Sequence, residues 1–183
     1  NITQTQSITA KNLGAVTGAG GTGSVKLSLT TNDVSIFAAQ ANGTAQEVDY
    51  QDATTFEVGT VLTGGPFAAD LKGIKASTTS GDGTVRLQTQ TGDITQTQSI
   101  TAKNLGAIAG AGASGTGSVK LSLTTNEAGV FAAQANGTAQ EVDYQDATTF
   151  DVGSVSVGGP FAATLNGVTV NTTDGIVRLQ TQT

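Results

Sequence analysis

Hydrophobic residues alternate with polar ones in short bursts along the chain. Val25, Leu27 and Leu29 alternate with Lys26 and Ser28. A period of two is typical of β-strands that bury one face. The pattern recurs and predicts one narrow core, built from these residues and their second-copy equivalents: Val25, Leu27, Leu29, Ile36, Val48, Tyr50, Val58, Val85 and Leu87.

Turn-forming sequences separate these bursts. Asn42-Gly43 and Gly64-Gly65-Pro66 are dipeptide and tripeptide signals of tight turns. No apolar pattern at helical spacing continues for as long as about ten residues. The sequence therefore predicts an all-β chain in which helix is nearly absent.

The two halves of the chain repeat each other. The segment FAAQANGTAQEVDYQDATTF at 37–56 recurs unchanged at 131–150, and VRLQTQT at 85–91 recurs at 177–183. The copies differ in length only within two stretches rich in small residues, which marks those stretches as surface loops. Tandem copying of this kind indicates an array of identical structural units. We therefore expect two continuous units, residues 1–92 and residues 93–183.

A repeat of this length has two all-β interpretations. An immunoglobulin-like sandwich has about this size, but the chain lacks Trp and Cys, and its units join without a linker through Thr91, Gly92 and Asp93. Six Phe and two Tyr in total suit the narrow interior of a solenoid. At roughly 20–24 residues per coil, a parallel β-helix (β-solenoid) would make about four coils per unit. We expect the units to be related by a translation plus a small rotation.

The order of the segments resembles a known repeat pattern. Each unit carries a strand ending in SITA, then GSVKLSLTTN, and later VRLQTQT. These motifs resemble the repeat regions of filamentous-haemagglutinin-like large exoproteins, which are two-partner-secreted adhesins of Gram-negative bacteria. The resemblance covers nearly the whole of both units. It implies a right-handed parallel β-helix that is secreted and displayed at the cell surface as a stalk or adhesive filament.

Composition removes most other classes of function. The chain has no His, Cys, Met or Trp, so it has no imidazole base, thiolate nucleophile or structural zinc ligand of these types. A net charge of −6 with eight scattered cationic residues leaves no basic stripe for nucleic acid. No apolar run reaches about 18 residues, so membrane insertion is not expected. We expect neither an enzyme nor a bound cofactor.

One group of carboxylates is copied in both units. Glu47 and Asp49 lie two apart on a predicted strand, so both project from its outer face about 7 Å apart, and Asp52 follows at the next corner. The interpretations are a solvated charged face that discourages sideways strand pairing, a calcium site, and an acid–base pair acting on a glycan. We favour the first, because a catalytic site is normally unique. The candidate residues are Glu47, Asp49, Asp52, Glu141, Asp143 and Asp146.

The function expected from these patterns is structural: a repeat segment in the shaft of a long extracellular filament or adhesin. Its expected partners are further copies of the repeat, in the same chain or stacked head to tail. One alternative is a carbohydrate- or host-binding face, although Tyr50 and Tyr144 are predicted to point inward. The other is a polysaccharide-cleaving β-helix enzyme. The TQTQ segments at 3–6 and 95–98 are expected to form hydrogen-bonded Gln and Thr ladders.

Overall fold

The computed structural model describes residues 1–18, 21–77, 82–172 and 174–183. Over these residues the chain is all-β without helix, as predicted, and each unit contributes ten strands. Those of the first unit are β1 (Ile2–Thr3), β2 (Thr9–Thr17), β3 (Val25–Leu27), β4 (Asp33–Ala41), β5 (Glu47–Asp52), β6 (Phe56–Val58), β7 (Thr60–Val61), β8 (Leu71–Lys72), β9 (Ile74–Ala76) and β10 (Thr84–Thr89). Those of the second unit are β11 (Ile94–Gln96), β12 (Ile100–Ala109), β13 (Val119–Leu121), β14 (Glu127–Asn136), β15 (Glu141–Asp146), β16 (Asp151–Val152), β17 (Ser154–Val155), β18 (Leu165–Asn166), β19 (Val168–Asn171) and β20 (Ile176–Thr181).

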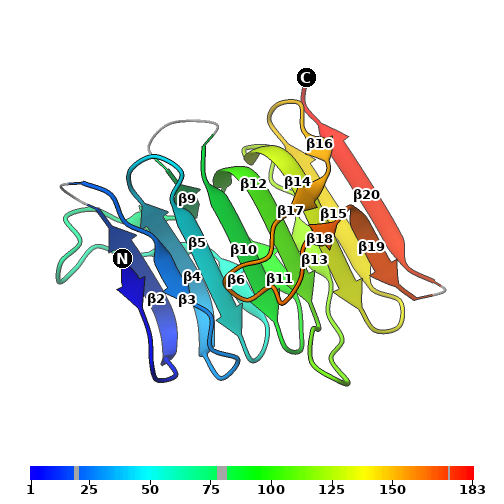
Figure 1. Cartoon of the computed structure of the whole chain (residues 1–183), viewed down its shortest axis with the longest axis horizontal. Helices are drawn as coiled ribbons and strands as arrows, with labels where there is room; N and C mark the ends of the chain where they lie inside the picture. The colour runs from blue at the N-terminus through cyan, green and yellow to red at the C-terminus, as the bar shows by residue number, and fades with distance from the viewer. Residues whose placement is uncertain (19–20, 78–81, 173) are drawn as a thin grey trace.

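Most of the described strands pair in parallel within one large sheet, and strands that are neighbours in this sheet are separated along the sequence. Ile2 pairs with Val25, Val25 with Val48, and Val48 with Val85, which are steps of 23, 23 and 37 residues. Figure 1 shows the strands side by side along the long axis, from β2 and β3 at one end to β20 at the other. The antiparallel sandwich alternative is therefore wrong.

The parallel strands form two rows. Row A contains β1, β3, β5 and β10 and continues into β12 and β14. Row B contains β2, β4, β6, β11, β13, β15 and β20. The rows face each other across the core, because Phe37 of β4 stacks on Tyr50 of β5 with ring centroids 4.0 Å apart. Strand β9 also lies beside β4 of row B. Strand β12 passes from row B to row A, since Thr101 pairs with Lys75 of β9 and Asn104 pairs with Thr84 of β10.

Equivalent strands of the two units lie in opposite rows. Among the described strands, the first unit supplies four layers to row A (β1, β3, β5, β10) and three to row B (β2, β4, β6). The second unit supplies four to row B (β11, β13, β15, β20) and three to row A (β12, β14, β16). An odd number of layers per unit therefore turns the second unit over by about half a turn. The expected small rotation between the units is therefore wrong.

The core is a single narrow cluster between the rows. Phe37, Tyr50 and Phe56 form an aromatic trio in it, in which Phe56 meets the Tyr50 ring edge-on at 5.0 Å. Phe131, Tyr144 and Phe150 repeat this trio in the second unit. Most of the predicted inward positions of the first unit are confirmed as buried: Val25, Leu27, Val48, Tyr50, Val58, Val85 and Leu87.

Some predicted core positions are wrong. Leu29 and Ile36 are only half-buried. On β4 the inward residues are Val34 and Phe37, three positions apart, because the strand turns a corner at Ser35 and the alternation of sides is interrupted there. The second-unit equivalents Leu123 and Val130 are half-buried too. At the end of the sheet three more equivalents are exposed, because they lie in its last layers: Val152, Val177 and Leu179.

Buried asparagines join neighbouring layers of strands. Asn126 is fully buried; its amide nitrogen donates to the carbonyls of Leu121 (3.1 Å) and Gln145 (3.0 Å), and its oxygen accepts from the Ile100 amide (3.0 Å). The Gln96 side chain pairs with the same amide group through two 2.8 Å hydrogen bonds. Asn32 and Gln4 repeat the arrangement. The ladders expected of the TQTQ segments thus involve Gln and Asn at these positions.

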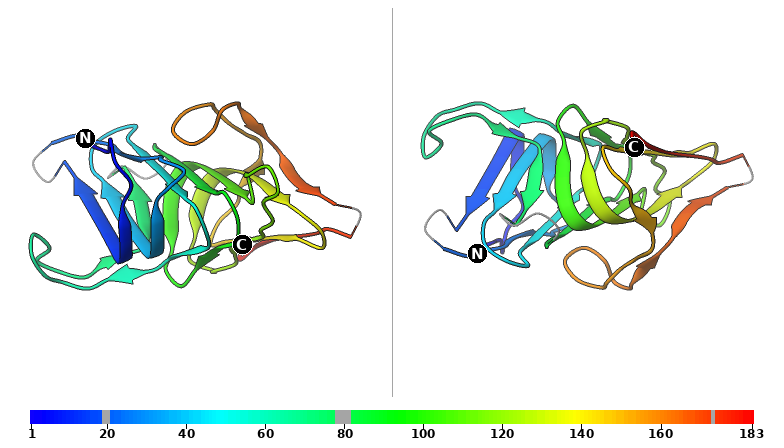
Figure 2. Two further views of the ribbon diagram at one scale, coloured as in Figure 1. Left: turned by 90° about the horizontal axis from the view of Figure 1, so that it is seen from below. Right: turned by 90° about the horizontal axis from the view of Figure 1, so that it is seen from above.

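Two hairpins lie outside the parallel rows. Strands β7 and β8 form the first hairpin (residues 60–72), and β17 and β18 form the second (residues 154–166). In the second hairpin, Val155, Phe161 and Leu165 form a separate apolar cluster with Ala132 of β14. Figure 2 shows the two hairpins on opposite sides of the molecule, as the half-turn between units requires. The sequence pattern predicted only a turn at their tips.

Gly106→Ala should test how closely the second hairpin sits on the sheet. A Cβ at Gly106 would lie 2.5 Å from Cε2 of Phe161, so the ring and its hairpin must move. We expect a loss of about 1–3 kcal/mol in the free energy of unfolding, measured by chemical denaturation. Gly14→Ala is the matched control, because it meets Phe67 of the first hairpin, which is only half-buried and free to shift outward. Equal losses in the two variants would contradict this packing.

Candidate functional site

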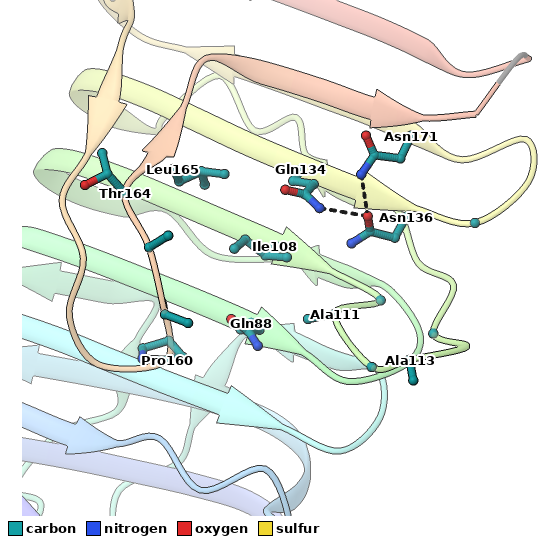
Figure 3. Close-up of a pocket in the computed structure, with 16 residues that line it drawn as sticks. Gln88, Ile108, Ala111, Ala113, Gln134, Asn136, Pro160, Thr164, Leu165 and Asn171 are labelled. Atoms are coloured by element: carbon teal, nitrogen blue, oxygen red, sulfur yellow. Dashed lines mark hydrogen bonds between the residues drawn. The ribbon is translucent and has the colours of Figure 1, made fainter.

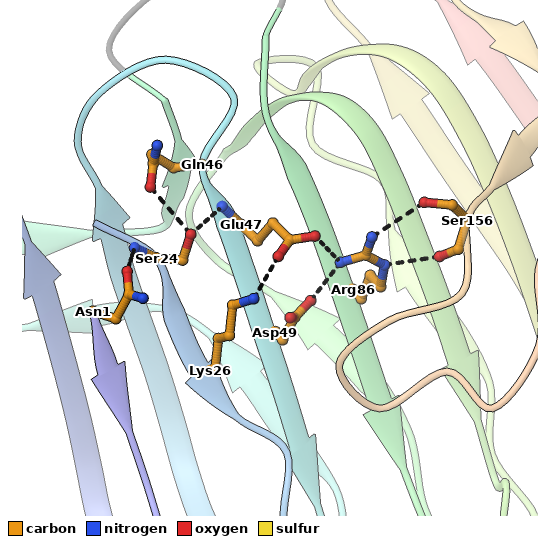
Figure 4. A network of polar contacts seen from close by, with 8 residues as sticks. All are labelled: Asn1, Ser24, Lys26, Gln46, Glu47, Asp49, Arg86 and Ser156. Carbon is orange, nitrogen blue, oxygen red and sulfur yellow. Dashed lines mark hydrogen bonds and ion pairs between the residues drawn. The ribbon is translucent and has the colours of Figure 1, made fainter. Parts of the chain in front are cut away.

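A charged cluster lies on the outer surface of row A (Figure 4). Parallel register places Lys26 of β3, Asp49 of β5 and Arg86 of β10 side by side across three neighbouring strands. Glu47 lies two residues before Asp49 on the same side of β5. Its carboxylate contacts Lys26 Nζ at 2.8 Å and Arg86 Nη1 at 2.8 Å, and Arg86 Nη1 also contacts Asp49 Oδ1 at 2.9 Å.

The second hairpin covers this cluster. Arg86 Nε donates to the carbonyl oxygen of Ser156 at 2.9 Å, and Nη2 donates to its hydroxyl at 3.2 Å. Gly159 lies against the Asp49 side chain so closely that a Cβ there would come within 2.3 Å of the carboxyl carbon. The exposed fractions of the Arg86 and Asp49 side chains are therefore 3% and 1%. The second unit thus seals a charged site that belongs to the first.

Burial and pairing set the charge states of the cluster. Burial raises the pKa of the Asp49 carboxyl, and the hydrogen bond from Arg86 offsets only part of the rise. One reason is that Asp49 Oδ2, among the described residues, is buried without a hydrogen-bond partner. Burial acts in the same direction on Glu47, but hydrogen bonds from Lys26 and Arg86 outweigh it and lower the pKa. Burial opposes the charged form of Arg86, yet its two carboxylates raise its pKa.

The equivalent cluster of the second unit is open. Arg178 contacts Asp143 at 2.8 Å and Glu141 at 3.1 Å. Its side chain is 53% exposed and that of Asp143 is 21% exposed. Lys120, the counterpart of Lys26, binds Asp93 at 2.8 Å instead. The same residues therefore form a covered site in one unit and an exposed one in the other.

The predicted third member of each carboxylate trio lies elsewhere. Asp52 is fully buried; it accepts hydrogen bonds from the Tyr50 hydroxyl and from the Val34 and Thr54 amides, the latter two at 2.9 Å. Burial raises the pKa of Asp52, and burial together with the bond to Asp52 raises that of Tyr50. Asp146 makes the equivalent contacts. The single solvated face predicted for the trio is wrong, because Asp52 lies on the same side of β5 as Val48 and Tyr50, which face the core.

Glu47 and Asp49 share the guanidinium group of Arg86, and Glu47 also contacts the ammonium group of Lys26. In the described part of the chain, no group of three or more Asp or Glu side chains is arranged to hold a metal ion. The arrangement can neutralise charge and fasten the second hairpin to the outer surface of row A. Sequence reasoning did not find Arg86 as the partner, because it lies 37 residues beyond Asp49; the parallel register of the repeated VRLQ segment is the signal that would have found it.

A second candidate is a groove of about 570 Å³ between the second hairpin and the 110–116 loop (Figure 3). Side-chain amides line one wall, where Asn136 Oδ1 accepts hydrogen bonds from Gln134 (2.8 Å) and Asn171 (2.7 Å). Small residues and Pro160 line the other, and the lining carries no aromatic or charged side chain. This chemistry suits a neutral polar group. The sequence did not reveal the groove because the excursion of the hairpin creates one wall.

Comparison with protein-family models, with curated proteins and with solved structures finds no significant match for this chain. Among the described residues, no helix is long and apolar enough to cross a membrane. The charged cluster and the parallel register are thus the observations on which a functional argument rests.

Proposed function

We propose that this chain is a right-handed parallel β-helix that serves as a repeat segment in the shaft of a long extracellular filament or adhesin. The observation that carries the proposal is the continuous parallel register across the boundary between the units. Val85 of the first unit pairs with Leu105 of the second, which in turn pairs with Phe131. A right-handed path follows the rule that about 98% of parallel crossovers obey.

A shaft needs units that extend one axis and hold their neighbours. Each unit adds about three and a half circuits, which at about 4.8 Å per layer amounts to about 17 Å of length. The charged cluster and the second hairpin add a lateral bond between the units. Display at the surface of a Gram-negative bacterium, after secretion, is supported by the resemblance to filamentous-haemagglutinin-like exoproteins.

Tandem chains of two, four and six units test the proposal. Small-angle X-ray scattering should give a maximum dimension that grows linearly by about 17 Å per unit at constant cross-section. Unfolding midpoints should rise with unit number, because every added unit gains one interface. Compact particles whose three dimensions grow together, or independent domains on flexible links, would contradict a shaft.

A carbohydrate-binding face is the second candidate function, and the amide-lined groove favours it. Asn136 and Asn171 present amide groups to a groove of suitable polarity for sugar hydroxyls. We expect neutral oligosaccharides, titrated into the chain, to change the NMR chemical shifts of amide groups that line the groove. The same titration of Asn171→Ala should give no such changes. Shifts absent at millimolar sugar would remove this candidate.

A further inference from the structure

The contact between the second hairpin and Arg86 shows how the second unit binds the unit that precedes it in the chain. The hairpin leaves row A at Gly153 and crosses the outer surface of β14 and β12, with Phe161 seated on Gly106. Its tip then reaches β10 and β5, where Ser156 accepts from Arg86 and Gly159 covers Asp49. We call this contact the clasp. It spans 70 residues of sequence and joins the two units.

The receiving half of the clasp recurs at the far end of the chain. Arg178, Asp143 and Glu141 repeat Arg86, Asp49 and Glu47 with the same ion pairs. A groove of about 540 Å³ lies over Asp143 and Arg178. The whole of β20 is exposed, including its apolar residues Val177 and Leu179. Their counterparts Val85 and Leu87 are fully buried on β10, which has β12 as its next neighbour in the sheet.

The gripping half of the clasp recurs in the first hairpin. Gly64 and Gly65 have φ values of 155° and 54°, and the corresponding Gly158 and Gly159 have 149° and 51°. Gly64 and Phe67 exchange the same pair of backbone hydrogen bonds as Gly158 and Phe161. No atom of residues 1–18, 21–77, 82–172 or 174–183 lies within 4 Å of a Cβ placed at Gly64 or Gly65. The first hairpin therefore already has the gripping conformation, which lowers the entropic cost of docking.

We propose that the first hairpin of one copy of this chain docks over Arg178 and Asp143 of a second copy, and that β2 of the first copy pairs in parallel with β20 of the second. This inference rests on the proposed filament function and names the contact that joins neighbouring copies. By equivalence with the β10–β12 pair, Val177 faces Leu13, Arg178 faces Gly14 and Gln180 faces Val16. The contact is heterologous, so it propagates into a fibre instead of closing a dimer.

Because of the half-turn between units, the exposed Arg178 cluster and the first hairpin both lie on the outer surface of row B. Strand β20 ends row B, and β2, which the first hairpin covers, begins row B. An added copy therefore continues row B with its hairpin directed at Arg178. Leu62 occupies the position of Ser156, so the main-chain acceptor for Arg178 Nε is kept while the hydroxyl acceptor is lost. The contact between copies has one hydrogen bond fewer than the clasp within the chain.

Engineered cysteines test the register, because the chain has no cysteine of its own. Val16→Cys combined with Gln180→Cys should give a series of disulfide-linked oligomers on mild oxidation, resolved on non-reducing gels. The two sites lie at opposite ends of one molecule, on β2 and β20 (Figure 1), so a bond between them joins two copies. Gln88→Cys with Ile108→Cys, the equivalent pair within the chain, should form an intramolecular bond and verifies the geometry.

An off-register pair is the negative control. Val16→Cys with Ile176→Cys displaces one thiol by four residues, about 13 Å along the strand, which exceeds the reach of a disulfide. This variant should give no disulfide-linked oligomers on non-reducing gels after the same oxidation. Equal cross-linking of both pairs, or cross-linking of neither, would overturn the proposed pairing of β2 with β20.

The clasp itself is tested by sedimentation equilibrium. Arg178→Ala should weaken self-association at least about tenfold, because a charge-assisted hydrogen bond and its ion pairs lose their donor. Replacing residues 60–72 by Asn-Gly should weaken it similarly, and the fold tolerates this, since Gly73 N already bonds Gly59 O at 2.9 Å. Lys103→Ala, which removes an exposed charge at a corner away from this contact, should change nothing.

The outcomes separate the two proposals. In-register cross-linking together with self-association that Arg178→Ala and the hairpin replacement do not weaken would support the pairing of β2 with β20. It would overturn the clasp between copies. A chain that stays monomeric at millimolar concentration would overturn the contact between copies, while linear growth of the tandem chains would still support the shaft.

Discussion

Arg86→Ala should lower the free energy of unfolding by about 3–5 kcal/mol, because it leaves a buried carboxylate without its cation. Asp49 is almost completely covered by the second hairpin, and one of its oxygens has no hydrogen-bond partner in the described part of the chain. Removing the guanidinium also leaves both oxygens of Ser156 without the donor that holds the hairpin tip. Urea denaturation of the wild type and the variant at neutral pH measures the loss.

The pH dependence identifies the cause of this loss. Burial already raises the pKa of Asp49, and without Arg86 the folded-state pKa rises further. A carboxyl group whose folded pKa exceeds its unfolded value binds more protons when folded, so stability falls as pH rises through that window. The difference between variant and wild type should therefore shrink as pH falls toward about 4. A difference independent of pH would contradict an unpaired Asp49 as its origin.

Two matched variants complete the test. The Asp49→Ala, Arg86→Ala double variant should be less destabilised than Arg86→Ala alone, since no charge is left buried without a partner. Arg178→Ala should leave the unfolding transition of the monomer unchanged within error, because Arg178 is half exposed and its ion pairs face solvent. Arg86→Ala and Arg178→Ala are equivalent substitutions in the two units. A difference between their stability losses therefore measures the effect of burial, because the residue types are the same.

The strands of this fold could be predicted from the sequence, whereas the relation between the units could not. Alternation at Val25 and Leu27 identifies β3 and its inward side, because a buried face needs a period of two. The number of strand layers per unit depends on the conformation of residues 59–73. They leave the sheet as a hairpin, which stretches the step from Val48 to Val85 to 37 residues and makes the count of layers odd.

The sequence predicted the outward-facing carboxylates of the candidate site, but it did not predict the residues that contact and cover them. Glu47 and Asp49 point outward as the alternation predicts. Their burial comes from Ser156 and Gly159, more than 100 residues away, and no local pattern encodes a contact made by the other unit. The same residue types are open in the second unit, so sequence alone assigns both clusters the same environment. The structure distinguishes the two clusters, because the second hairpin covers Arg86 and Asp49 and leaves Arg178 exposed.

Asn126→Ala should be the most damaging change of a polar side chain in the interior, with an expected loss of about 3–5 kcal/mol in the free energy of unfolding. The amide joins three circuits: it bonds Gln96 and the Ile100 amide on one side and the Gln145 carbonyl on the other. Truncation leaves several buried backbone groups unpaired, each costing about 1–3 kcal/mol before relaxation. The measurement is chemical denaturation followed by far-ultraviolet circular dichroism.

Exposed and buried asparagines of the same chain provide the comparison. Asn166→Ala removes an amide that bonds only the Ser154 side chain and the Thr164 carbonyl at the surface, and it should cost under about 0.5 kcal/mol. Asn32→Ala removes the equivalent network of the first unit, which bonds Gln4, Leu27 and Gln51, and should cost nearly as much as Asn126→Ala. A loss at Asn126 as small as the loss at Asn166 would show that water replaces the inner hydrogen bonds, and that the apolar core alone holds the layers together.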